Sequence, residues 1–244
     1  MNNMNNYGRK IELFCDASMK TYDNGRTFGC AYAMCPLSPQ YVKYAISPDS
    51  TNNRSELVAL YLAVELGYEI MKLEKEYNGV IYDHIDVYSD SQFGVYGLTR
   101  WMDSWIRSMD EHGVMYGTSS NHPVKNQELF KAILSNIANK KINVNFYHQL
   151  GHINPNNPRK LAEANKSFER SNGFILMPED IYKISFYNDI VDKKSGEILE
   201  EINPDDYIRM DYSQNHLRTM CNYVVPKDYS KYINGGRSNG VYVH

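Results

Sequence analysis

The sequence predicts an α/β protein built on a mixed five-stranded sheet. Three apolar segments follow one another near the N-terminus with short connections, as in an antiparallel meander. Amphipathic helical segments then alternate with two further apolar segments, giving the order βββαβααβα, which is typical of an α/β layer. The chain has 244 residues, of which 42% are hydrophobic and 23% charged, so it can bury a substantial core.

The first half of this order is set by clear turn and helix signals. We expect strands at 11–16, 28–34 and 41–46, separated by turns at Asn24-Gly25 and between Pro36 and Pro39. Apolar residues at helical spacing predict a long helix over about 54–76, and Gly79 follows its end. A fourth strand is predicted at 85–89.

The second half completes the sheet and its helical layer. A helix is expected from Ser91 through Trp101, and Pro123 suits the first position of a helix over about 124–138. A fifth strand over 142–147 and a Pro/Asn loop over 154–158 follow. The last helix of this region carries Leu161, Ala164 and Phe168 on one face and stops near Asn172-Gly173.

These elements define a domain over 10–173, preceded by a flexible N-terminus over 1–9. Residues 174–244 form a C-terminal extension with a different character. Its apolar segments at 182–187 and 197–202 flank a Lys-Lys-Ser-Gly turn, which predicts a hairpin. The function of this extension is not readable from the sequence.

Composition narrows the function classes. The formal charge of −3 does not favour a tight nonspecific nucleic-acid binder, although it is compatible with an enzyme that contacts phosphates at a few points. The four cysteines show no CxxC pairing, which favours reduced thiols. The polar N-terminus and the lack of a long apolar run predict a cytoplasmic protein with no membrane association, and we expect a monomer.

Three acids carry the chemistry. Asp16 and Asp90 each follow an apolar strand, and Glu56 lies one turn into the long helix. Each acid alone would be an ordinary solvated strand end or helix turn, as we expect for Asp83 and Asp86. Together they can gather at one edge of a sheet, where their mutual repulsion requires divalent cations between them. The sequence therefore predicts a two-metal site for phosphoryl chemistry.

Five short segments in this order resemble type 1 ribonuclease H. They are FCDAS at 14–18, TNNRSEL at 51–57, DSQF at 90–93, PVKN at 123–126 and LGH at 150–152. The resemblance covers about two thirds of the chain and implies a ribonuclease H-like fold with a C-terminal appendage. It implies a Mg²⁺-dependent endonuclease that hydrolyses the RNA strand of RNA–DNA hybrids and leaves 5′-phosphate and 3′-hydroxyl ends.

The resemblance also implies the cofactor and its ligands. Asp16, Glu56 and Asp90 would hold two Mg²⁺ ions, with Mn²⁺ as a substitute, and Asp16 would bridge both. The family carries a fourth acid in the last helix, but residues 159–171 contain no aspartate. Asn165 takes that position best by helical phase, with Glu163 as the alternative.

A histidine in the loop before the last helix assists proton transfer or product release in the resembled family. His152 matches that position, and a loop histidine with a near-neutral pKa suits a shuttle role. His148, at the end of the fifth strand, is the competing candidate, and we expect it to be structural.

Substrate contacts carry over in the same way. Thr51, Arg54 and Asn126 match the family's pocket for a DNA-strand phosphate, and their donors suit that anion. Asn52, Asn53 and Gln92 match residues that contact base edges or ribose 2′-hydroxyls, which distinguish RNA from DNA.

Two departures from the family's sequence pattern leave an alternative function open. The segment that would form the family's basic handle is nearly neutral here, and Trp101 and Trp105 in it suit core packing. With Asn165 in the fourth ligand position, the chain is alternatively a catalytically weak nucleic-acid-binding module on the same fold. A bacterial or phage source would suit such a chain.

Overall fold

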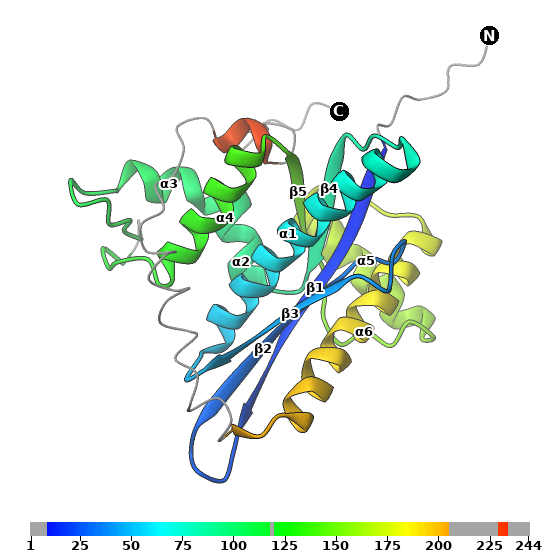
Figure 1. The fold of residues 1–244 in the computed structure, drawn as a ribbon, viewed down its shortest axis with the longest axis horizontal. Helices are drawn as coiled ribbons and strands as arrows, with labels where there is room; N and C mark the ends of the chain where they lie inside the picture. Colours follow the sequence, from blue (N-terminus) through cyan, green and yellow to red (C-terminus); the bar gives the residue numbers. More distant parts are fainter. Residues whose placement is uncertain (1–8, 118–119, 205–228, 234–244) are drawn as a thin grey trace.

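A mixed five-stranded sheet forms the centre of the protein (Figure 1). The computed structural model describes residues 9–117, 120–204 and 229–233. The strands are β1 (Lys10–Thr21), β2 (Thr27–Met34), β3 (Val42–Pro48), β4 (His84–Ser89) and β5 (Asn143–His148), in the order β3-β2-β1-β4-β5. Strands β1, β2 and β3 pair antiparallel, whereas β4 lies parallel to both β1 and β5. The predicted α/β class, sheet type and meander are confirmed.

The β1 strand is longer than predicted, and this places Asp16 inside it. Pairing with β2 continues to Thr21, but pairing with β4 ends at the Phe14–Tyr88 step. Asp16 therefore lies where β1 has lost its β4 neighbour, so one flank of the strand is open at that point.

One face of the sheet is covered by α1 (Asn52–Asn78) and α4 (Gln127–Lys140) (Figure 1). Helix α2 (Gln92–Tyr96), a π-helical turn η1 (Gly97–Trp101) and α3 (Met102–Arg107) belong to the same layer. Ile11, Leu13 and Cys15 of β1 alternate toward this face and join its fully buried core. Trp105 is also buried there, as the core-packing interpretation predicts, while Trp101 stays 37% exposed.

The opposite face is covered by α5 (Pro158–Asn172) and α6 (Pro178–Glu201). Its core contains Phe14 and Tyr88 from the sheet, Phe168 from α5, and Ile184 and Val191 from α6. Because side chains alternate along a strand, Asp16 points to the same face as Phe14 and thus toward α6. A bond between Ser18 of β1 and Ser195 of α6, 2.6 Å between hydroxyl oxygens, agrees with that placement.

The hairpin predicted in the C-terminal extension is wrong, because both of its strands belong to the continuous helix α6. The helix begins with Pro178 at its first position, a placement that suits proline. Its buried residues recur at three- and four-residue spacing: Ile181, Ile184, Ser185, Asn188, Val191, Ser195 and Leu199. Several of these buried residues are polar, so the sequence does not show the apolar periodicity of a helix. Gly196 lies within the helix, although a glycine in a sequence usually indicates a turn.

A smaller correction concerns α4, which begins at Gln127 instead of near Val124. Asn126 precedes it in the left-handed conformation, with φ of 56°. Pro123 instead lies in an isolated β-bridge with Tyr116.

The end of the described chain returns to the sheet. A short 3₁₀ turn, η2 (Tyr229–Tyr232), precedes Ile233, which makes a parallel bridge with Val144 of β5. Residues 1–8, 205–228 and 234–244 lie outside the described residues, and with them most of the predicted N-terminus and the distal extension. Among the described helices, none is both long and apolar enough to cross a membrane.

Candidate active site

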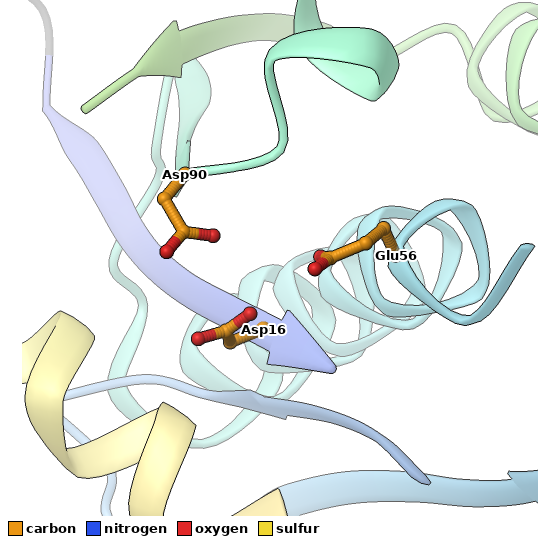
Figure 2. A group of neighbouring side chains, drawn as sticks. All are labelled: Asp16, Glu56 and Asp90. Carbon is orange, nitrogen blue, oxygen red and sulfur yellow. The ribbon is translucent and has the colours of Figure 1, made fainter. Parts of the chain in front are cut away.

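Three carboxylates from three different elements meet at the open flank of β1. Asp16 comes from β1, Asp90 directly follows β4, and Glu56 lies on the second turn of α1. Figure 2 shows the three side chains pointing toward one another. One ligand oxygen from each lies within 4.8 Å of the others. The structure therefore brings together all three acids that the sequence predicts.

The register of the sheet explains the meeting of Asp16 and Asp90. Strands β1 and β4 run parallel with Phe14 opposite Tyr88, so two further steps set Asp16 beside Asp90. Glu56 approaches because the start of α1 lies very close to β2. A Cβ on Gly29 would stand 2.0 Å from the Ser55 hydroxyl, so only glycine allows this approach.

The cluster is electrostatically strained when no cation is bound. Burial and the neighbouring Asp90 charge raise the pKa of Asp16 to about 8. Burial, with Asp16 and Asp90 close by, raises the pKa of Glu56 well above its usual range. Burial also raises the pKa of Asp90. Each of these pKa values is therefore shifted toward the protonated form, as expected for like charges held together away from water.

The donor set fits a hard divalent cation. Glu56 is only 7% exposed, and its Oε2 atom is buried with no hydrogen-bond partner. A buried, unbonded carboxylate oxygen is costly, and it would gain most from a positive ion among these acids. Carboxylate oxygens are the ligands that Mg²⁺ and Mn²⁺ prefer. Asp16, Glu56 and Asp90 can therefore hold such an ion.

The acids lie in the wall of a cavity of about 620 Å³. A fourth carboxylate, Asp192 of α6, lines the same cavity, and its charge contributes to the raised pKa values of Asp16, Glu56 and Asp90. Sequence reasoning missed Asp192 because the segment around it was assigned to a hairpin turn. The helical spacing of Ile184, Asn188 and Val191 is the signal that could have found it.

The structure does not bring Asn165 or Glu163 to the cluster. The Asn165 side-chain amide donates to the backbone oxygen of Leu176 and accepts from the backbone nitrogen of the same residue, at 2.8 and 3.1 Å. It thereby ties α5 to the connection before α6. Glu163 pairs with Lys160 at 2.9 Å, and neither residue lines the cavity.

The two candidate histidines have different surroundings. His152 lines the cavity, its side chain is 78% exposed, and its Nδ1 atom lies 3.2 Å from Asp192 Oδ2. His148 is buried, and its Nδ1 atom lies 3.0 Å from the Ser171 hydroxyl. Burial lowers the pKa of His148, which favours an uncharged structural ring.

Of the predicted substrate contacts, Asn52, Asn53 and Gln92 line the cavity beside the acids, and all three are exposed. Arg54 and Asn126 also lie together, with Arg54 Nη1 donating to Asn126 Oδ1 at 3.3 Å.

The guanidinium of Arg54 also pairs with Glu128 at 2.5 Å. Thr51 is the exposed N-cap residue of α1, and its side chain makes no capping bond. It does not line the cavity.

The RNase H family profile matches residues 8–165, which include all five strands and the three clustered acids. The chain belongs to the RNase H family. It is similar to the ribonuclease H of Bordetella pertussis, with 26% identity over 167 residues, 68% of this chain and 94% of that protein. It is also similar to the ribonuclease HI of Rickettsia conorii, with 30% identity over 133 residues, 54% of this chain and 74% of that protein.

Among solved structures, the chain is similar to LC11-RNase H1 in complex with an RNA/DNA hybrid. The identity is 16%, the TM-score is 0.35, and the likeness covers 68% of this chain and 93% of that one. The family match ends within α5, so the whole of α6, with Asp192, lies beyond it.

Proposed function

We propose that this protein is a divalent-metal-dependent endonuclease that hydrolyses the RNA strand of RNA–DNA hybrids, leaving 5′-phosphate and 3′-hydroxyl ends. The observation that carries the proposal is the Asp16, Glu56 and Asp90 cluster, with its unbonded Glu56 oxygen, on an RNase H family chain. We expect a monomer that acts in the cytoplasm.

Two Mg²⁺ ions are the proposed cofactors, with Mn²⁺ as a substitute, and when bound they would activate a water molecule and stabilise the leaving oxygen. Asp16, Glu56 and Asp90 supply the carboxylates that hold them. We propose Asp192, which lines the same cavity from α6, as the fourth ligand in place of Asn165 or Glu163. A fourth carboxylate supplies more negative charge than an amide, which favours the binding of a second ion.

His152 is the residue that we propose for proton transfer near the leaving group. Its exposed ring in the wall of the cavity can exchange protons with water, and its contact with Asp192 orients it. A histidine suits this role because its imidazole can both accept and donate a proton.

The hybrid would be held by the polar residues around the cavity. We propose that Asn52, Asn53 and Gln92 read base edges and ribose 2′-hydroxyls, because amides both donate and accept hydrogen bonds. Arg54, Asn126 and Thr51 are proposed to bind a phosphate of the DNA strand. Arginine's forked donors suit that contact, and binding requires the phosphate to compete with Glu128 for the guanidinium.

Cleavage of a labelled RNA–DNA hybrid with Mg²⁺ tests the proposal, beside single-stranded RNA, double-stranded RNA and DNA. The test variant is Asp16→Asn, which removes a charge from the acid cluster. The matched control is Asp86→Asn, which removes a buried acid of β4 that pairs with Lys10 and lies outside the cluster.

We expect cleavage of the hybrid alone, lost in Asp16→Asn and retained in Asp86→Asn. Binding of the hybrid without cleavage in either Mg²⁺ or Mn²⁺ would contradict the nuclease proposal. That outcome would favour a nucleic-acid-binding module.

A further inference from the structure

Helix α6 contacts the acid cluster at two points, although it lies wholly beyond the segment that matches the family. Asp192 faces the cavity, and Asn188, one turn earlier on the same helix face, lies behind Asp90. The bond between Ser18 and Ser195 fixes the next turn of the helix against β1. This stripe of polar contacts holds α6 in register with the strand that carries Asp16.

The side-chain amide of Asn188 makes hydrogen bonds to two residues, Asp90 and Gln149. It is only 2% exposed, and it is hydrogen-bonded to the Asp90 carboxylate. Its Oδ1 atom accepts a bond from Gln149 Nε2 at 2.5 Å, so its amino group is the end that is free to donate to Asp90.

Gln149 is itself 2% exposed, and its backbone nitrogen bonds Ser89, the residue before Asp90. Asn188 is thus held by the same loop that flanks the acid.

A neutral donor is the right chemistry for this position. Asp192 repels Asp90, and Asp16 and Asp90 repel each other, so these charges favour any rotamer that carries the Asp90 carboxylate away from the cluster. A lysine or arginine here would hold Asp90 but would also cancel the charge that attracts a cation. An amide holds the carboxylate in place and leaves its negative charge intact.

We propose that Asn188 is a positioning residue that fixes the Asp90 carboxylate for metal binding, so that helix α6 is a working part of the active site. The inference rests on the proposed function, because it gives Asp90 the role of a metal ligand. It goes further by making a residue outside the family-matched segment necessary for the geometry of that ligand.

Isothermal titration with Mg²⁺ alone, without nucleic acid, tests the inference on the full chain. The variant Asn188→Leu keeps the side-chain volume and removes the donor. Gln149→Met leaves Asn188 in place and removes the bond that orients its amide. Val191→Ala is the matched control, because it opens a cavity in the buried face of α6 and changes no polar contact.

We expect Mg²⁺ affinity to fall about 10–100-fold in Asn188→Leu and by a smaller factor in Gln149→Met, as for other residues that orient metal ligands. Val191→Ala should lose thermal stability and bind Mg²⁺ as the wild type does. At saturating Mg²⁺, hybrid cleavage by Asn188→Leu should recover most of its rate with an unchanged KM for the hybrid.

Two results would overturn the inference: wild-type affinity in both Asn188→Leu and Gln149→Met, or an equal loss of affinity in Val191→Ala. If Asn188→Leu does not fold, Gln149→Met decides by the same comparison. Absence of Mg²⁺ binding by the wild type would instead remove the proposed function itself, so the two failures are distinguishable.

Discussion

Gly151 lies directly against the carboxylate of Asp90. A Cβ on Gly151 would stand 2.0 Å from Asp90 Oδ2 and 3.0 Å from its Cγ, closer than atoms can approach. The loop that carries His152 thus packs on the acid from one side, while Asn188 bonds it on another. The position of Asp90 is therefore decided by segments that are distant from it in the sequence.

Replacing Gly151 by alanine should displace Asp90 without unfolding the protein. The added methyl group forces the carboxylate to rotate away, because all three atoms that it would meet belong to the Asp90 side chain. We expect Mg²⁺ affinity to fall at least tenfold, on the order seen when ligand-orienting contacts are lost, measured by isothermal titration. Gly196→Ala is the control, since its Cβ would meet only Ser18 Oγ at 3.7 Å. Unchanged affinity in Gly151→Ala would contradict the contact.

The metal-free protein should lose stability as the pH rises. An unfolded aspartate titrates near pH 4, whereas the pKa of Asp16 in the folded protein is about 8. Between these values the folded state binds more protons than the unfolded state, so its stability falls with rising pH. Asp16→Asn lacks this titration. With EDTA present, we expect it to match the wild type near pH 4 and to exceed it near pH 8.

Urea unfolding at several pH values measures that difference. Mg²⁺ at pH 8 should close the gap by stabilising the wild type and not the variant. A difference between the two proteins that stays constant from pH 4 to pH 8 would show that Asp16 is not protonated in the folded protein.

Neutralising Asp192 should weaken metal binding without affecting the fold. Asp192→Asn removes a charge from the cavity wall at a side chain that is 31% exposed. We expect the affinity for Mg²⁺ and the rate of hybrid cleavage at low Mg²⁺ to fall on the order of tenfold.

Asp189→Asn, on the same helix but paired with Lys193, is the charge-matched control. If the cleavage rate falls and Mg²⁺ affinity does not, Asp192 acts by orienting His152 and not as a ligand.

Removing the Arg54 side chain should weaken hybrid binding while leaving the chemistry intact. Arg54→Ala deletes the donors that we assign to a DNA phosphate, so KM should rise with little change in kcat. The slope of log affinity against log salt should decrease by about one, as for loss of one phosphate contact. Lys75→Ala, at the opposite end of α1, is the control. An unchanged salt slope in Arg54→Ala would place the phosphate elsewhere.

Most of the sheet and its three acids could be predicted because their signals are local. Alternating strands, turn residues and the long helix of α1 are encoded in short windows, and each acid follows directly from one of them. The register of parallel strands then brings Asp16 and Asp90 together with no further information.

The α6 side of the site could not be predicted in this way. Its inner face mixes Asn188 and Ser195 with apolar residues, so the usual apolar stripe of a helix is broken. Those polar residues are buried because partners on β1 and in the loop before His152 satisfy them. Such partners exist only once the chain is folded, so no local pattern marks them.

The sequence by itself thus determined the α/β sheet and the Asp16, Glu56 and Asp90 cluster, whose carboxylates can hold a metal ion. The tertiary structure alone decided that Asp192 is the fourth carboxylate in the wall of this cavity and that Asn165 lies outside it. The physical reason is that α5 turns its amide toward the backbone of Leu176, while α6 occupies the sheet face toward which Asp16 points.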